Sequence, residues 1–267
     1  MFVLMKELDP VGVEERRKDA YNRHGTFQVP GPNFLWSIDG HLKLQAYGIE
    51  IYAGIDGYAR YVPWIYVGVS GRTATSILKQ YLEAIESGSF NMPFAIRSDH
   101  GTETVLIANA HWQLHQANRP NIPFKDIYFY GTSTLNQRIE SWWQRLSRGQ
   151  TKKWRNFFHT LGQEGYFDGS DADIIAILAV FIPILRFEVL NWVHLWNIHT
   201  IRKQKSRPGI IDGKPFMNYF HPTSSNPSAK DCAQHINPEV FHQLKQDVAD
   251  YGMLTYTISK ELNSKLN

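Results

Sequence analysis

Cysteine is almost absent from this sequence of 267 residues, in which Cys232 stands alone. A single cysteine cannot form a disulfide within the chain, so the fold has to be stabilised by packing and hydrogen bonds. The same scarcity excludes zinc sites built from cysteine. Chains without disulfides are typical of reducing compartments, so we expect an intracellular protein.

Long apolar runs are also missing. The longest covers residues 174–185 and is interrupted by Pro183, whereas a membrane-spanning helix needs roughly 20 apolar residues. The apolar run at residues 1–5 is too short for a signal peptide. The sequence contains no internal repeat and no low-complexity tract. We therefore predict a soluble globular protein without a membrane partner, built as one large domain with or without extensions.

Neither positive nor negative charge is in large excess, and the net charge is only +3. A mildly basic chain permits a nucleic-acid partner without requiring one. Lysine and arginine gather near residues 14–18, 145–155 and 202–207. Aromatic residues are abundant, with 8 Trp, 13 Tyr and 15 Phe. Most of them are expected in a core, and a few could stack on bases.

Two aspartates stand where short apolar stretches end. The stretch at residues 94–98 is followed by Asp99 and a glycine turn, and the stretch at residues 33–39 closes with Asp39 before Gly40. Carboxylates at the ends of strands project into clefts instead of cores. Each aspartate taken alone could equally be a turn residue, because Asp-Gly turns are common.

A third carboxylate lies on a predicted helix over residues 135–146. Ile139, Trp142, Trp143 and Leu146 form its apolar stripe, and Glu140 lies beside that stripe. Two strand aspartates and one helix glutamate make a trio that could hold a divalent metal ion.

The order of predicted elements indicates an α/β fold. Three strands are followed by alternating helices and strands, which predicts a mixed five-stranded sheet flanked by helices. In such a sheet the first and fourth strands are neighbours, so Asp39 and Asp99 would meet. The expected strands cover residues 33–39, 47–56, 61–69, 94–98 and 127–130, and the expected helices cover 73–87, 103–116 and 135–146.

Four short blocks carry a family resemblance. They are WSIDGH (36–41), GIDGYAR (54–60), RSDHGTE (97–103) and NQRIESW (136–142). Together and in this order they closely resemble the integrase core domain family of DDE transposases and retroviral integrases, especially its eukaryotic transposon-derived group. Four blocks at suitable spacings are far more specific than one. The resemblance implies a ribonuclease H-like fold, in agreement with the order of elements.

The resemblance also implies a chemistry. Such proteins cut and join DNA by in-line displacement at two magnesium or manganese ions. Asp39 would then bind both ions, Asp99 one and Glu140 the other. The implied partners are transposon ends and target DNA, together with further copies of the chain in a homo-oligomer. The implied location is the nucleus if the source is eukaryotic. Asp56, which also precedes a glycine, is interpreted as structural, together with Arg60.

Other polar residues near these blocks are candidates for DNA contact. Phosphate binding by such side chains would add affinity that falls with salt. For each of them a plain structural role, such as a helix cap or a solvated face, stays open. The candidates are His100, Asn136, Arg138, Lys152, Lys153, Arg202 and Lys203.

We divide the chain into a helical lead-in at residues 1–30, a catalytic core at 31–205 and a C-terminal extension at 206–267. Within the core, residues 171–199 should form a helix that is kinked or divided at Pro183. The extension should comprise a loop at 209–227 and a helix at 237–251. Burial is expected for Trp142, Trp143 and Trp154, and the apolar face of the 171–199 helix should comprise Ile174, Ile175, Leu178, Phe181, Ile182, Leu185, Val189, Trp192 and Trp196.

Two other functions compete with an active enzyme that cuts and joins DNA. One is a domesticated, catalytically idle descendant that binds DNA or protein. The other is a nuclease acting on RNA–DNA hybrids, against which stands the helix-borne Glu140. Hybrid nucleases usually keep an additional carboxylate.

Overall fold

The structure is a computed structural model that describes residues 29–131, 136–203 and 211–249. Its centre is a five-stranded sheet with the order β3-β2-β1-β5-β6. β1, β2 and β3 pair antiparallel, whereas β5 and β6 continue the sheet in parallel with β1. This arrangement confirms the predicted mixed α/β fold. The strands are β1 (Leu35–His41), β2 (Glu50–Asp56), β3 (Trp64–Gly68), β5 (Ala95–Ser98) and β6 (Tyr128–Tyr130).

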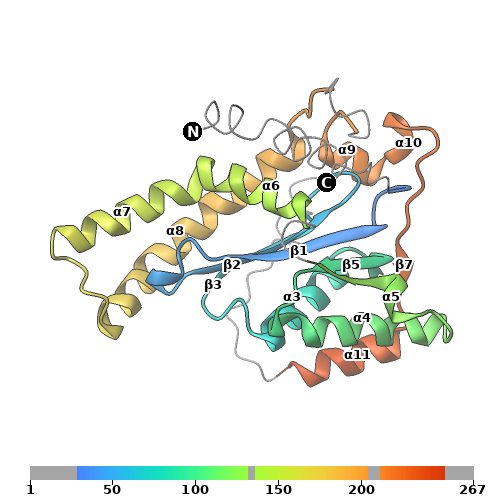
Figure 1. Ribbon diagram of the computed structural model, residues 1–267, viewed down its shortest axis with the longest axis horizontal. Coiled ribbons are helices and arrows are strands. Elements are labelled where there is room, and N and C mark those ends of the chain that lie inside the picture. The colour runs from blue at the N-terminus through green and yellow to red at the C-terminus, as the bar shows by residue number, and fades with distance from the viewer. Residues whose placement is uncertain (1–28, 132–135, 204–210, 250–267) are drawn as a thin grey trace, which may run out of the picture.

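Helices cover both faces of the sheet (Figure 1). On one face lie α3 (Ala74–Ser87), α4 (Val105–Asn118) and α11 (Pro238–Asp247). On the other face lie α6 (Gln137–Leu146) and α8 (Asp171–Ile198). The shorter elements are η1 (Gln45–Tyr47), η2 (Thr102–Thr104), α5 (Phe124–Ile127), η4 (Ser147–Thr151), α9 (Pro215–Phe220), α10 (Pro222–Ser225), β4 (Asn91–Met92) and β7 (Gln234–His235).

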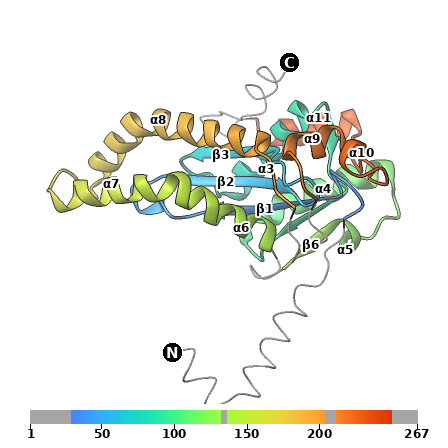
Figure 2. The same cartoon turned by 90° about the horizontal axis from the view of Figure 1, so that it is seen from above.

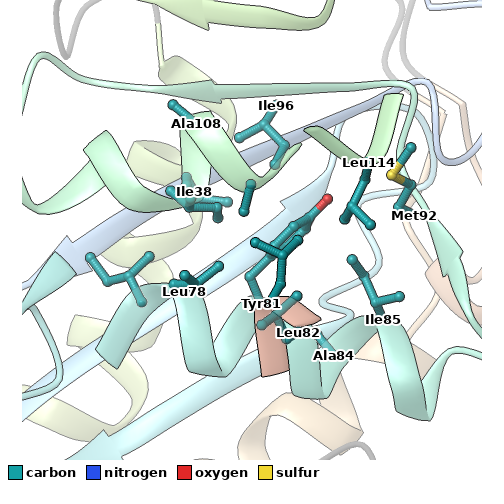
Figure 3. Packing of buried hydrophobic residues seen from close by; sticks show 14 of the residues in the cluster. Ile38, Leu78, Tyr81, Leu82, Ala84, Ile85, Met92, Ile96, Ala108 and Leu114 are labelled. Carbon is teal, nitrogen blue, oxygen red and sulfur yellow. The ribbon is translucent and has the colours of Figure 1, made fainter. Parts of the chain in front are cut away.

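The first core fills the space between the sheet and α3, α4 and α11. Ile38 of β1 and Ile96 of β5 face Tyr81 and Leu82 of α3 across this space (Figure 3). Each fully buried side chain of this kind stabilises the fold by about 1.5–3 kcal/mol. Side chains alternate along a strand. Because Ile38 faces this core, its neighbour Asp39 faces the opposite side of the sheet, toward α6.

The second core lies on that opposite side. Ile51 and Ile55 of β2 pack there with Ile139 of α6 and Leu185 of α8. The predicted apolar stripe of α6 is confirmed, because all four of its members are buried. Trp154 is buried as well, as expected.

The helix α8 forms an arm together with α7 (Lys152–Gln163), and both extend past the end of the sheet (Figure 2). The helix was expected to be kinked or divided at Pro183. It is not divided, because α8 runs through Pro183 without interruption. Ile175 was expected to be buried but is 65% exposed, since the first turns of α8 lie beyond the strands. Among the described helices, including this one, none is long and apolar enough to cross a bilayer.

The described C-terminal residues pack closely on the rest of the molecule. β7 pairs with β4, and Phe241 of α11 is buried in the first core. The loop expected at residues 209–227 is wrong in part, because α9 and α10 form there. Tyr219 of α9 stacks on Tyr61, with ring centroids 4.5 Å apart, and this contact stabilises a helix that its loop-like composition did not predict. The last helix begins after Asn237, whose side chain caps it as expected.

Candidate active site

Asp39 lies within β1, on the side that faces α6. The strand was predicted to close at Asp39, but it continues to His41, because Gly40 and His41 still pair with β2. The indole N–H of Trp143 donates a hydrogen bond to Oδ2 of Asp39 at 3.0 Å. The sequence marked Trp143 only as a core residue, so this contact with Asp39 is one that sequence reasoning missed.

Asp99 follows β5 directly, as expected. The parallel register of β1 and β5 pairs Ser37 with Arg97. Asp39 and Asp99 each lie two residues beyond that pair. Neighbouring strands lie about 4.8 Å apart, so the sheet brings the two carboxylates to adjacent positions from residues sixty apart in the sequence.

Glu140 comes to the same place from α6. The start of this helix is tied to β1, because Nδ2 of Asn136 donates to the backbone oxygen of Ile38 at 3.0 Å. Asn136 is only 2% exposed, which removes it from the residues able to contact DNA directly. Its contact holds α6 next to Asp39 instead.

The three carboxylates influence one another electrostatically. Burial above all, with the negative charges of Glu140 and Asp99, raises the pKa of Asp39 to about 7 against the lowering effect of its hydrogen bonds. Partial burial raises the pKa of Glu140, and the charge of Asp99 adds to that rise. Burial and the nearby charge of Glu103 raise the pKa of Asp99. Like charges held close together in this way are stabilised by a bound cation.

The donor set fits a hard divalent cation, which prefers carboxylate oxygens. As the side chains stand, no three His, Cys, Asp or Glu residues in the described ranges are grouped tightly enough to hold a metal ion. Trp143 occupies one oxygen of Asp39. Asp39, Asp99 and Glu140 would therefore have to change their side-chain positions to share an ion.

Basic residues close to the carboxylates were also missed by sequence reasoning. Arg72 forms an ion pair with Glu103 at 2.9 Å, and its positive charge lowers the pKa of Asp99. The charge of Lys43 lowers the pKa of Glu140. A motif could not reveal either contact, because Arg72 and Lys43 lie outside the four blocks.

The side chain of Arg72 passes directly over Gly40. A Cβ atom at Gly40 would lie 3.0 Å from both Cδ and Nε of Arg72. A glycine after Asp39 therefore permits this close approach. A cleft of about 630 Å³ opens beside Arg72 and is lined in part by Glu50, Thr102 and Glu103.

The remaining candidates for DNA contact lie at varied distances from the carboxylates. His100 is exposed next to Asp99, and Arg138 is half-buried in α6. Lys152 is exposed and lies 12 residues after Glu140, about 18 Å along a helix. Lys153 forms an ion pair with Glu188 at 2.8 Å. Arg202 and Lys203 are exposed beyond the end of α8.

Asp56 has the structural role that was expected of it. It is fully buried, and its carboxylate accepts hydrogen bonds from the backbone N–H groups of Asn33, Tyr58 and Ala59 at 2.6–3.0 Å. These bonds hold the turn after β2 against the start of the described chain. Asp56 therefore belongs to the fold and not to the carboxylate trio.

The sheet order, the aspartates on β1 and after β5, and the glutamate on α6 define a ribonuclease H-like α/β protein with a carboxylate site. The family model described as integrase core domain matches residues 26–212. Because the match spans most of the sequence, the chain belongs to the integrase core domain family. A search of curated proteins gave no match.

Proposed function

We propose that this protein cuts and joins DNA at a site formed by Asp39, Asp99 and Glu140. The observation that carries the proposal is the parallel register of β1 and β5, which pairs Ser37 with Arg97 and so brings Asp39 and Asp99, each two residues further on, to adjacent positions. The helix α6 adds Glu140, whose charge raises the pKa of Asp39. Membership of the integrase core domain family supports the same class of chemistry.

Each residue has a separate task in this proposal. Asp39, Asp99 and Glu140 would hold two magnesium or manganese ions. When bound, such ions stabilise the charge that develops on the attacking and leaving oxygens of a phosphodiester. Trp143 orients the Asp39 carboxylate through its indole N–H. Arg72 keeps the Asp99 carboxyl more acidic than its burial alone would allow.

Basic side chains around the site would bind the DNA backbone. Lys43 lies close enough to Glu140 to affect its pKa, and Lys152, Arg202 and Lys203 are exposed. Each phosphate contact releases condensed counterions, so binding should weaken as salt rises, with a slope of about −0.9 per contact on duplex DNA. Replacing one such lysine should reduce the magnitude of that slope by about 1.

A second candidate function is DNA binding without catalysis. It is favoured by one observation, namely that no three metal-binding side chains of the described residues are grouped tightly enough for an ion as they stand. In that case the carboxylates would be vestiges of an active ancestor. The two candidates differ in whether DNA strands are broken.

A plasmid assay separates these two functions. Supercoiled plasmid with manganese should be nicked or joined by the wild-type protein and left intact by Asp99→Asn. Asp171→Asn is a matched control, because Asp171 is an exposed acidic residue at the start of α8 on the far end of the arm. Activity in both wild type and control, with none in Asp99→Asn, supports the enzyme. Binding of plasmid without any nicking supports the idle alternative.

Self-association forms a second part of the proposal. Val180, Ile184, Phe187 and Leu195 of α8 are 46–64% exposed and share one side of the helix. An apolar helix face that carries no charge of its own suits a second copy of the same helix related by a two-fold axis. Phe187→Glu should convert a dimer to a monomer in sedimentation experiments, whereas Thr200→Glu beyond the end of the helix should not. Equal mass for wild type and Phe187→Glu contradicts this part.

A further inference from the structure

Exposed aromatic rings form a continuous cluster beside Asp99. His100 stacks on Tyr130 with ring centroids 5.1 Å apart and planes 15° from parallel. Phe124 lies next to Tyr130, at 6.3 Å between centroids. Tyr130 is 37% exposed and Phe124 is 38% exposed. Large aromatic rings that are partly exposed, and that other residues do not cover on every side, offer surface for a planar ligand.

The cluster lies next to the site because of the sheet register. Tyr130 of β6 pairs with Ser98, the last residue of β5, and Asp99 follows Ser98. His100 is the next residue along the chain, so its Cα lies about 3.8 Å from the Cα of Asp99. A phosphodiester held at Asp99 would therefore place its own nucleotides within reach of these rings. Successive bases along one strand are only about 3.4 Å apart.

The rings are held in position by the fold. Tyr128, which is buried, packs against Tyr130 at 4.8 Å between centroids. Its hydroxyl lies 3.1 Å from Oγ of Ser98. The backbone N–H of Gly131 also donates to the oxygen of Ser98, at 3.0 Å. Because the rings are already ordered, a ligand that stacks on them loses little free energy to immobilising side chains.

We propose that His100, Tyr130 and Phe124 form a stacking platform for a nucleobase unpaired beside the reacting phosphodiester. The proposal rests on the proposed function, because a DNA strand that reacts at the carboxylates brings its bases next to these rings. Stacking suits this position, since every base has a π face and a platform of rings accepts any sequence. The platform would hold an unpaired base aside and so keep the phosphodiester accessible to the carboxylates.

Binding of a single-stranded oligonucleotide containing 2-aminopurine tests the platform. The fluorescence of this base falls when it stacks on an aromatic ring, and the experiment is done without divalent metal so that no chemistry occurs. Wild type, Tyr130→Leu and Tyr130→Phe are compared. Tyr166→Leu is the matched control, because Tyr166 is 73% exposed in the connection between α7 and α8, at the far end of the arm.

We expect wild type, Tyr130→Phe and Tyr166→Leu to quench the fluorescence equally. Tyr130→Leu should lose the quenching and bind at least about fivefold more weakly, the effect of losing roughly one stacked base. Circular dichroism checks that Tyr130→Leu is folded, and His100→Ala gives a second variant that leaves β6 intact. Wild-type quenching that persists in both variants would overturn the platform, and so would a wild type that does not quench.

Failure of the platform can be told from failure of the proposed function. Asp99→Asn should quench 2-aminopurine as wild type does, because the platform uses rings and not the carboxylate. If wild type and Asp99→Asn quench alike while wild type breaks no DNA with manganese, the chemistry fails and the platform stands. If wild type breaks DNA but Tyr130→Leu and His100→Ala both still quench fully, the platform fails and the chemistry stands.

Discussion

Trp143 on α6 donates its indole N–H to the carboxylate of Asp39 on β1 at 3.0 Å. The same indole stacks on His41 with ring centroids 4.9 Å apart. His41 is itself fixed, since its Nε2 lies 3.0 Å from Oγ1 of Thr151. Burial lowers the pKa of His41 to about 4, so it is neutral near pH 7. The contacts from Thr151 through His41 to Trp143, all of them uncharged groups, therefore orient the carboxylate of Asp39.

Trp143→Phe should remove this hydrogen bond and keep an aromatic ring in place. A hydrogen bond to a charged group contributes about 1.5–3 kcal/mol, and Asp39 is charged only above its raised pKa of about 7. We therefore expect a larger loss of unfolding free energy at pH 8.5 than at pH 4, by roughly 1–2 kcal/mol after allowing for solvent. Urea unfolding at the two pH values measures this difference. An equal loss at both values would show that only packing was lost.

Asp39→Asn should stabilise the protein while it disables the site. The folded pKa of Asp39, about 7, exceeds its ordinary value of 3.8, so the native state binds more protons between these values than the unfolded state. Stability then falls as pH rises from about 4 to 7. An asparagine carries no charge to be desolvated. We expect it to raise the unfolding free energy by about 1–3 kcal/mol at pH 8 and to change it little at pH 3.5.

Asp56→Ala should have the opposite effect on stability. Three buried backbone N–H groups lose their acceptor, and each unsatisfied donor costs about 1–3 kcal/mol. We expect a loss of at least roughly 3 kcal/mol in urea unfolding. Asp126→Ala is the control, because Asp126 is exposed on α5 and such substitutions usually stay within about 0.5 kcal/mol. A mild effect at Asp56 would mean that the turn after β2 is held by other contacts.

Gly40→Ala tests the contact with Arg72. The added Cβ would lie 3.0 Å from Cδ and Nε of Arg72, so the arginine has to shift and its ion pair with Glu103 is strained. We expect Gly40→Ala to reduce the unfolding free energy by about 1 kcal/mol in wild type, as mild overpacking does. In an Arg72→Ala background the cost should shrink. A double-mutant cycle measures this coupling, and strictly additive effects would contradict the contact.

The sequence was sufficient for those parts of the site that depend on local pattern. Asp99 stands after an apolar strand and Glu140 beside an apolar helical stripe, and both lie where the pattern predicted. The pairing of the first and fourth strands followed from the order of elements. The extra length of β1 beyond Asp39 could not be predicted in this way, because it depends on which residues of β2 lie opposite Gly40 and His41.

Contacts between distant segments could not be read from the sequence in the same way. The ion pair of Arg72 with Glu103 joins the turn before α3 to η2, which follows β5. The helix α9 packs on a distant segment through the stacking of Tyr219 on Tyr61, and a local composition typical of loops does not reveal that contact. Asn136 was a candidate for phosphate contact because it precedes Glu140 on the predicted helix, with a helix cap as the alternative. Its true neighbour is the backbone of Ile38.

The most direct test of the account is calorimetric titration of manganese into wild type and Asp99→Asn, each with and without DNA. Wild type should bind manganese, and the loss of one carboxylate should abolish most of the heat. Because side chains must rotate to share an ion, binding should be tighter when DNA is present. Equal heats for wild type and Asp99→Asn, or none for either protein with DNA, would contradict a metal site at Asp39, Asp99 and Glu140.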